Sequence, residues 1–363
     1  MWFVHFQDII FITILHFALS VNSGTLFFII RRVIYAIFTL IILIVFLFLL
    51  IHIIAPNPLE LARIYAGNPH IPTTTLENIV KRYGLNQPVY IQIISYISMI
   101  FHGNLGMDPI YNAPELTLIG TFFPITLELV FPAIIVAVLL GIFTGAIAAS
   151  RRGKPTDYGV KILYLSSWGT PPFLVAILLQ LVVAYDLKLL PAVNMVNPIL
   201  TAPPSVTPFP LINAIWAGDW TYFVSLIHHM ILPAIALATI SFGIVTRLTR
   251  ASMLDVMETD FFRLSLMKGL SRKKTVYGVA LRNAALPLVT LIVLLFAYSV
   301  AGAVVIEDIF DYHGMGYFIV QAIDNLDYIA ILDTTIIVGI AIIIANLIAD
   351  VLYGILDPRV ILE

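Results

Sequence analysis

Cysteine is absent from the 363-residue chain, which excludes disulfides, thiolate metal ligands and cysteine nucleophiles. Charge is scarce as well, because Asp, Glu, Lys and Arg make up only 11% of the residues, against about 25% in a typical soluble domain. Hydrophobic residues make up 60%, and the mean hydropathy is +1.01. A chain this long and this apolar cannot cover a soluble surface with polar groups, so we expect lipid to be its main solvent. The net charge of −2 neither favours nor excludes an anionic partner.

Long apolar runs dominate the chain, and each has the length that a membrane-spanning helix needs, about 20 residues. They are continuous and lack the ~10-residue alternation of a transmembrane β-barrel. The sequence therefore predicts an all-α polytopic membrane protein with six core helices. The expected spans are residues 33–54, 122–149, 162–184, 224–246, 284–306 and 329–355.

Lys and Arg concentrate on the cytoplasmic side of membrane proteins, and here they are distributed very unevenly. Of the 19 Lys and Arg residues, 15 lie before the first run, between the second and third, between the fourth and fifth, or after the sixth. The other four are Arg63, Lys81, Arg82 and Lys188. An even number of spans then places both ends of the six-helix core in the cytoplasm.

Residues 267–287, MKGLSRKKTVYGVALRNAALP, carry the densest positive charge and precede the fifth run. Upstream of them, apolar residues at helical spacing predict a helix that starts near Asp255. Gly269 is the expected C′ residue of this helix, and Ser271 is the expected N-cap of the next one. Pro287 is expected to begin the fifth span, where its missing N–H is harmless.

The next three residues, Arg272, Lys273 and Lys274, would fall in the first turn of that second helix. Positive charge is unfavourable there, by roughly 0.3–1 kcal/mol per exposed charge. Helix stability therefore does not explain the cluster. Orientation in the membrane explains its sign, whereas docking of a cytoplasmic partner would also explain the break between the two helices.

Five blocks of sequence, in order, resemble one family. They are RRVIYAIFTLIILIVFLFLLIHIIAPNP, YGLNQPVYIQIISYISMIFHGNLG, TLELVFPAIIVAVLLGIFTGAIAASRRG, LTRASMLDVMETDFFRLSLMKGLSRKKTVYGVALRNAALPLVT, and VVIEDIFDYHGMGYFIVQAI followed by NLIADVLYGILDPR. The chain resembles, from about residue 29 to its end, the permease subunits of ATP-binding-cassette importers, in the dipeptide/oligopeptide branch. The resemblance implies the type I importer permease fold. His313 stands where this branch usually has proline.

The resemblance divides the chain into functional segments. Residues 1–26 form an N-terminal extension, either an interfacial helix or an extra span, and 27–54 the first transmembrane helix. An extracellular loop region at 55–118, in which residues 75–106 are expected to form one or two helices, precedes the permease core at 119–356, and 357–363 form a cytoplasmic tail. A second outer loop, 185–222, is rich in proline, which argues against a regular helix there. Both outer loops offer a surface to an extracellular partner.

Within the core, the resemblance makes residues 255–282 a cytoplasmic coupling loop that binds an ATPase subunit. Gly269 matches the family's glycine, and Arg263, Leu264 and Ser265 occupy the positions that are often Glu-Ala-Ala in the wider family. Leu264 is bulkier than the residue usual at its position. The expected coupling residues are Arg263, Leu264, Ser265, Met267, Lys268, Gly269, Leu270, Ser271, Arg272, Lys273 and Lys274.

The partners implied by the resemblance are a homologous second permease, two ABC ATPases, an extracellular substrate-binding protein and membrane lipid, with no nucleic acid. The chain itself is expected to carry no catalytic residue and no cofactor, because ATP and Mg²⁺ would bind to the ATPases. The branch implies import of oligopeptides. Some of its members in archaea and thermophilic bacteria carry oligosaccharides, so import of short glucans is the alternative.

Other motifs give weaker signals. RRGKPT at 151–156 lacks the glycine spacing and the Ser or Thr of a phosphate-binding loop. His228 and His229 are adjacent, so on a helix they point about 100° apart and are poor partners for one metal ion. Asp324, Asp327 and Asp333 are expected to form a solvated acidic rim at the outer end of the sixth span rather than a cation site.

A translocation path is expected near two features of the core. Glu128 lies inside the second span, where an acidic residue is costly and commonly functional, although a paired structural role is the main alternative. Pro171 and Pro172 interrupt the third span, and such breaks are tolerated where a neighbour or a cavity satisfies the backbone. We therefore place Trp168, Pro171 and Phe173 near the path.

Two rival classes have less support. A secondary transporter or channel would need facing charges at mid-membrane or an inverted repeat, and the sequence has neither in a clear form. An integral-membrane enzyme would need a converging set of acid–base or metal-binding residues, which the spacing does not indicate.

Overall fold

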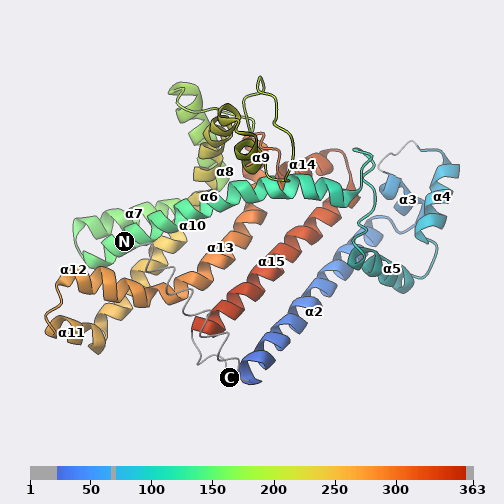
Figure 1. The fold of residues 1–363 in the computed structure, drawn as a ribbon. Helices are drawn as coiled ribbons and strands as arrows, with labels where there is room; N and C mark the ends of the chain where they lie inside the picture. Colours follow the sequence, from blue (N-terminus) through green and yellow to red (C-terminus); the bar gives the residue numbers. More distant parts are fainter. Residues whose placement is uncertain (1–22, 67–70, 357–363) are drawn as a thin grey trace.

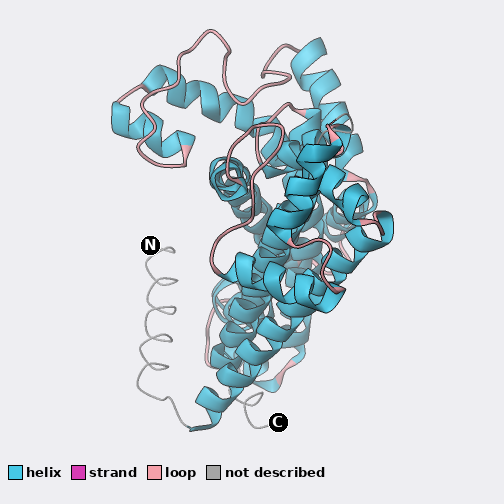
Figure 2. Cartoon of the chain, turned by 90° about the vertical axis from the view of Figure 1, so that its right-hand side faces the viewer, coloured by secondary structure: helices cyan, strands magenta, loops and turns pink. Residues whose placement is uncertain are grey.

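The computed structural model describes residues 23–66 and 71–356, so most of the predicted extension 1–26 and the tail 357–363 lie outside it. The described residues form helices joined by turns and loops (Figures 1 and 2). Five helices are long: α2 (Ser23–Ile54), α6 (Glu115–Ser150), α10 (Trp220–Glu258), α13 (Leu281–Ile309) and α15 (Tyr328–Leu356). The shorter ones are α3 (Pro58–Ala66), α4 (Thr73–Tyr83), α5 (Val89–Phe101), α7 (Pro155–Gly169), α8 (Pro172–Leu179), η1 (Gln180–Asp186), α9 (Pro210–Ala217), α11 (Asp260–Met267), α12 (Arg272–Lys274), η2 (Thr275–Ala280) and α14 (Met315–Asp324).

In the described part of the chain, five helices are long and apolar enough to cross a membrane on their own. They correspond to all the predicted spans except the third. The third consists of two pieces, 155–169 and 172–186, that meet at an angle of 101°. The bend falls at Pro171 and Pro172, where the sequence predicted a break. The described residues therefore contain five continuous candidate spans, and six if the bent pair counts as one.

Helices α6 and α10 pack closely along their lengths (Figure 1). Their closest approach is at Gly141 and Gly145, which are four residues apart on α6 and therefore on one face. A Cβ atom on Gly145 would lie 2.7 Å from the carbonyl oxygen of Thr246, and one on Gly141 would lie 2.7 Å from Val245. The hydroxyl groups of Thr144 and Thr246 are 3.0 Å apart across the same contact. Small residues at this spacing let membrane helices pack backbone to backbone.

Ion pairs connect helices near the end of the molecule where most of the Lys and Arg side chains lie. Arg32 on α2 binds Asp350 on α15 at 2.7 Å. Asp157 on α7 is fully buried, and it accepts two hydrogen bonds from Arg250 on α10, at 2.7 and 3.0 Å. Lys161 also lies 3.2 Å from Asp157. This network holds the start of the bent span against α10.

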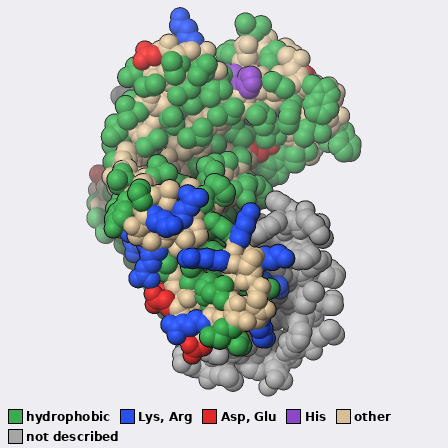
Figure 3. Space-filling view, turned by 90° about the vertical axis from the view of Figure 1, so that its left-hand side faces the viewer, with side chains coloured by type: hydrophobic (Ala, Val, Ile, Leu, Met, Phe, Trp, Pro, Cys, Tyr) green, Lys and Arg blue, Asp and Glu red, His purple; other side chains and the backbone are tan. Residues whose placement is uncertain are grey.

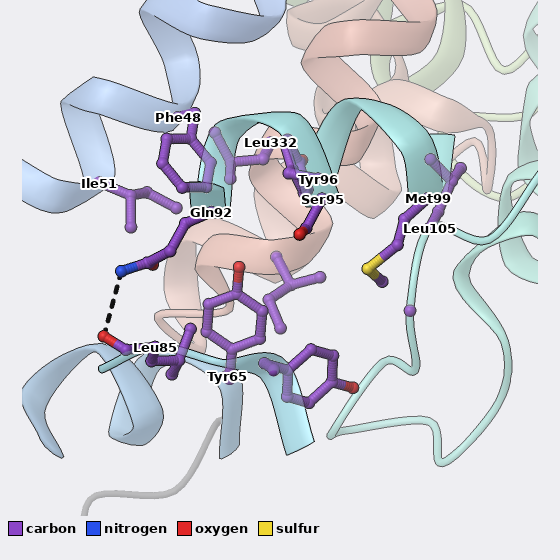
Figure 4. A pocket seen from close by; sticks show the side chains of 13 residues that line it. Phe48, Ile51, Tyr65, Leu85, Gln92, Ser95, Tyr96, Met99, Leu105 and Leu332 are labelled. Atoms are coloured by element: carbon purple, nitrogen blue, oxygen red, sulfur yellow. Dashed lines mark hydrogen bonds between the residues drawn. The ribbon is translucent and has the colours of Figure 1, made fainter. Parts of the chain in front are cut away.

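At the other end, α3, α4 and α5 pack against α2 and α15 and enclose a small apolar pocket (Figure 4). Gln92 on α5 lies in its wall and is buried. Its amide nitrogen donates to the carbonyl oxygens of Leu85, at 3.1 Å, and Gln87, at 2.7 Å. Its oxygen lies 3.0 Å from a ring nitrogen of His52 on α2. The buried amide therefore ties the first outer region to the first span. Within 75–106 that region has two helices, α4 and α5, as expected, and α3 precedes them.

Three further expectations from sequence differ from the structure. The second outer loop contains a helix, α9, because Pro210 lies at its start, where no N–H is needed. Pro287 does not begin a helix, because α13 starts at Leu281 and continues through it. Asp255 and Glu258 belong to the end of α10 rather than to a separate helix, since α10 continues past the predicted limit of 246 to residue 258.

The contact between α6 and α10 gives a test of the fold. Gly145→Ala should lower the free energy of unfolding by about 1–3 kcal/mol, because the methyl group forces the two backbones apart. Gly120→Ala on the same helix is the control, since a Cβ there meets nothing within 4 Å. Thermal unfolding of the purified protein in detergent measures both. Equal midpoints for the two variants would show that the close contact does not hold the helices together.

Candidate functional site

Positive charge gathers at one end of the molecule, over α7, α11 and α12 and the end of α10 (Figure 3). Arg272, Lys273 and Lys274 are exposed there. Arg263 pairs with Asp260 one turn away, at 3.5 Å. Both side chains are largely exposed, so this pair contributes little to stability. The cluster is therefore available to a partner in water.

The turn between α11 and α12 has the geometry that the sequence predicted. Gly269 follows the C-cap residue Lys268 and has a φ of 80°, a left-handed conformation that glycine adopts without strain. The hydroxyl oxygen of Ser271 accepts a hydrogen bond from the N–H of Lys274 at 3.5 Å, so Ser271 is the N-cap. The backbone at Gly269 is open, because a Cβ there would meet no atom within 4 Å.

The predicted apolar coupling residues lie on the outside of this turn. The side chains of Leu264, Met267 and Leu270 are 52%, 82% and 42% exposed. Leu264 does not disturb the packing of α11 within this chain, since it points away from the other helices. Ser265 donates a hydrogen bond to the carbonyl oxygen of Phe261 within its own helix.

Phe262 anchors α11, and sequence reasoning missed it. Its side chain is 6% exposed and packs with Met253 of α10, Val276 and Ala280 of η2, and small residues of α6. It lies on the face of α11 opposite to Leu264 and Met267. The signal was available, because an amphipathic helix with apolar residues on two faces can contact two partners.

The helix that follows the turn is continuous with a membrane span. Residues 272–309 form α12, η2 and α13 without an intervening loop. The middle piece, η2, has π-helical hydrogen bonding, which is frequent at functional sites. The basic cluster is therefore joined to the fifth span by a continuous helix.

The break in the third span leaves apolar side chains uncovered. Trp168 and Phe173 are 51% and 48% exposed, and Pro171 is exposed between them. The guanidinium of Arg247 on α10 lies 5.3 Å from the centre of the Trp168 ring, within the range of a cation–π interaction. These three predicted residues are thus brought together at one place, while Glu128 is engaged elsewhere.

Two glutamates within the membrane helices hold the starts of short helices. Glu128 on α6 accepts a hydrogen bond from the N–H of Leu211, at 3.0 Å, at the start of α9. Glu307 on α13 accepts bonds from the N–H groups of Gly316, at 2.7 Å, and Tyr317, at 3.3 Å, at the start of α14. Carboxylates are favoured at helix N-termini. The described contacts of Glu128 are therefore those of a helix-capping residue.

The expected solvated acidic rim near the outer end of the sixth span is wrong for two of its three residues. Asp324 is exposed, but Asp327 and Asp333 are 0% and 1% exposed, so a solvated rim is the wrong description of them. Asp327 precedes α15 and accepts hydrogen bonds from the N–H groups of Ile329 and Ala330, both at 3.1 Å. Burial raises the pKa of Asp327, although these two hydrogen bonds oppose the shift. Sequence alone gave no sign of this burial, because it depends on segments distant in the chain.

Two family models together match nearly the whole described chain. Residues 137–362 match the binding-protein-dependent transport system inner membrane component, and residues 25–137 match the N-terminal part of such membrane components. The second match covers most of α2 and the helices α3–α5, and the first covers the turn at Gly269 together with α9 and α14.

Similar proteins carry names from peptide transport. The dipeptide transport system permease protein DppB of Escherichia coli (strain K12) is 35% identical over 336 residues, 92% of this chain and 98% of that protein. The probable D,D-dipeptide transport system permease protein DdpB of the same organism is 35% identical over 313 residues, 86% and 91% of the two chains. The oligopeptide transport system permease protein AppB of Bacillus subtilis (strain 168) is 31% identical over 296 residues, 81% and 87%.

These matches agree with the helical architecture and with the resemblance seen in the sequence. They cover the spans, the bent helix pair and the exposed turn at Gly269 in a single alignment of most of the chain. The chain belongs to the family of inner membrane permease components of binding-protein-dependent ABC transport systems.

Proposed function

We propose that this chain is one of two homologous permease subunits in an importer driven by two ABC ATPases, and that it translocates oligopeptides delivered by an extracellular binding protein. ATP and Mg²⁺ bind to the ATPases, and this chain contributes no catalytic residue and no cofactor. The observation that carries the proposal is the exposed turn between α11 and α12, joined without a loop to the fifth span.

The exposed turn has the composition of a protein interface. Leu264, Met267 and Leu270 are uncovered apolar residues beside a cluster of three basic ones. The charges keep this end in water rather than in lipid, and an apolar patch in water marks an interaction site. Burial against an ATPase would contribute roughly 1.5–3 kcal/mol for each fully covered side chain. The basic residues would orient the partner through acidic groups, in a salt-dependent way.

The bent third span supports a second permease and a path between the two. Backbone that leaves the helix at membrane depth is tolerated only where it contacts protein or lines an aqueous cavity. The break at Pro171 is uncovered on this chain, with Trp168 and Phe173 exposed beside it. A second permease would cover part of this surface, and the rest would line the translocation path. Glu128 then acts from behind the path by holding α9.

Transport would follow alternating access. Closure of the ATPase dimer moves α11 and α12, and the continuous helix to Ile309 carries this displacement into the membrane. Rigid bundles then tilt about their contacts, as packed helices move between discrete arrangements. Glu128 and Glu307 each hold the start of a short helix, which gives ion coupling at these two residues little support.

The orientation proposed from the 15 of 19 basic residues can be tested with single cysteines, because the native chain has none. Ser205→Cys should react from outside sealed cells with an impermeant thiol reagent, and Lys273→Cys should react only after the membrane is opened. Both positions are exposed. Labelling of Lys273→Cys from outside would overturn the orientation.

If the turn between α11 and α12 docks onto an ATPase, a substitution at Gly269 should weaken that docking. Gly269→Val places a β-branched residue at a φ of 80°, which costs roughly 1–2 kcal/mol. If the native turn is needed for docking, retention of the ATPases should fall by about 5–30-fold, as measured by co-purification and by substrate-stimulated ATP hydrolysis at matched permease content.

Two control variants separate docking from strain. Gly153→Val introduces the same type of strain at another turn, where φ is 75° and a Cβ meets nothing within 4 Å, and it should retain the ATPases. Gly269→Asn should be mild, because asparagine tolerates this conformation. If Gly269→Val assembles and couples like the parent, the turn is only a connector.

Substrate class is tested by uptake. Peptide import is favoured because the three relatives described above are named for dipeptides or oligopeptides. Proteoliposomes that contain the whole complex and its binding protein should accumulate labelled di- to pentapeptides when ATP is supplied, and should not accumulate short glucans. Accumulation of glucans alone would replace oligopeptides by oligosaccharides in the proposal and leave the coupling mechanism unchanged.

A further inference from the structure

A cluster of three carboxylates lies at the end of the molecule opposite to the basic turn. Asp108 belongs to the loop between α5 and α6, Glu115 is the first residue of α6, and Asp327 immediately precedes α15. One carboxylate oxygen from each lies within 4.8 Å of the others. The basic end of α6 is 36 residues away along the same helix, or roughly 50 Å at 1.5 Å per residue.

All three side chains are removed from solvent, with exposures of 1%, 0% and 0% for Asp108, Glu115 and Asp327. Burial of one ionised carboxylate without a partner costs several kcal/mol. Three such groups side by side also repel one another. Among the described residues, no lysine or arginine forms an ion pair with any of them. Something else must balance this negative charge.

Hydrogen bonds hold each aspartate by one oxygen and leave the other free. Asp108 Oδ1 accepts from the N–H groups of Ile110, at 2.7 Å, and Tyr111, at 2.6 Å. Asp327 Oδ1 is held in the same manner by the start of α15. The Oδ2 atoms of both aspartates are buried without a hydrogen-bond partner in the described structure. The backbone therefore fixes the direction of each free oxygen.

The environment of Glu115 gives a second reason to expect a bound ligand. Its side chain is fully buried, and neither of its carboxylate oxygens has a hydrogen-bond partner among the described residues. A purely structural carboxylate would use the N–H groups of its own helix N-terminus or a neighbouring donor. Glu115 instead has two unpaired oxygens, and one carboxylate oxygen of Glu115 lies within 4.8 Å of an oxygen of each aspartate.

A fourth carboxylate adds to the negative field. Asp333, two turns along α15, is 1% exposed. Its Oδ1 accepts a hydrogen bond from the hydroxyl of Tyr96 at 3.3 Å, while its Oδ2 has no partner in the described structure. A divalent cation balances such a field better than a single shared proton does.

The ligand chemistry selects among the cations. Every donor is a carboxylate oxygen, and histidine and cysteine are missing from the cluster, so zinc is disfavoured. Ca²⁺ binds oxygen at 2.3–2.6 Å, so oxygens that lie within 4.8 Å of one another are close enough to share one such ion. Mg²⁺ needs shorter bonds and keeps several waters, which a fully buried cluster is less able to provide.

We propose that Asp108, Glu115 and Asp327 bind one calcium-class divalent cation, which fastens the outer loop 102–114 to the start of α6 and to the start of α15. The ion joins the first outer region to the second and sixth spans. Occupancy of this site then stiffens the outer face against which a binding protein would dock. The alternative is that the carboxylates share protons and remain free of metal.

The test uses the full-length chain purified with its partner subunits after treatment with chelator. The probe is radioactive ⁴⁵Ca²⁺ in equilibrium dialysis at neutral pH, with a tenfold excess of Mg²⁺ present. The complex with the parent chain should bind one more Ca²⁺ per permease chain than the complex with Glu115→Gln, which keeps the shape and removes the charge. Asp324→Asn removes an exposed acidic residue from the same end, and it should bind like the parent.

A second measurement does not depend on the variant's folding. Addition of Ca²⁺ to the parent complex should raise the midpoint of thermal unfolding of this chain by several degrees, and Mg²⁺ at the same concentration should raise it less. No Ca²⁺ bound to the parent, or equal binding by the parent and a folded Glu115→Gln complex, would overturn the proposal. Stabilisation of the parent by mild acid alone, without a response to Ca²⁺, would assign the cluster to shared protons.

Discussion

The close contact between α6 and α10 is the constraint on which the other arrangements depend. Gly141 and Gly145 allow the two backbones to touch, and lipid offers no hydrophobic drive that could replace this packing. Because α6 is fixed in this way, the groups along its length are fixed as well. Glu115 is at one end, Thr126 and Glu128 are in the middle, and Ser150 is at the basic end. One helix therefore connects the carboxylate cluster, the capped outer helices and the coupling end.

Buried polar groups near the membrane are used to satisfy backbone donors that lipid would leave unpaired. Thr126 is an example, since its hydroxyl donates a hydrogen bond to Glu307 at 2.6 Å and accepts one from the N–H of Met315 at 2.7 Å. Glu307 then caps α14, as Glu128 caps α9. An intramembrane glutamate in this fold thus positions a short outer helix, and the outer face is attached to the spans through these caps rather than through apolar contact alone.

The sequence predicted the helical class, the positions of the spans and the turn at Gly269, because each follows from local signals: apolar length, charge asymmetry and a glycine followed by a serine cap. It located the break at Pro171 but could not give its 101° angle, because such an angle depends on how the two pieces pack against other helices. The burial of Asp327 and Asp333 was missed for a similar reason. Acidic residues near the start of a span are expected to face solvent. Their burial here involves residues more than 200 positions away, such as Tyr96, which donates a hydrogen bond to Asp333.

The positive cluster at the start of α12 has a physical meaning that its sequence alone left open. In the structure, Arg272, Lys273 and Lys274 occupy the first turn of a helix that runs on to Ile309, so they oppose its dipole. Orientation in the membrane would be served equally well by the same charges one or two turns earlier, at the end of α11, where the dipole favours them. Their position beyond Gly269 instead places them next to exposed Leu270 and Met267 on a rigid extension of the fifth span. Basic residues at a helix N-terminus next to exposed apolar residues are best explained by a partner that contacts both. Acidic groups on that partner would offset the unfavourable interaction with the helix dipole, and its surface would cover Leu270 and Met267.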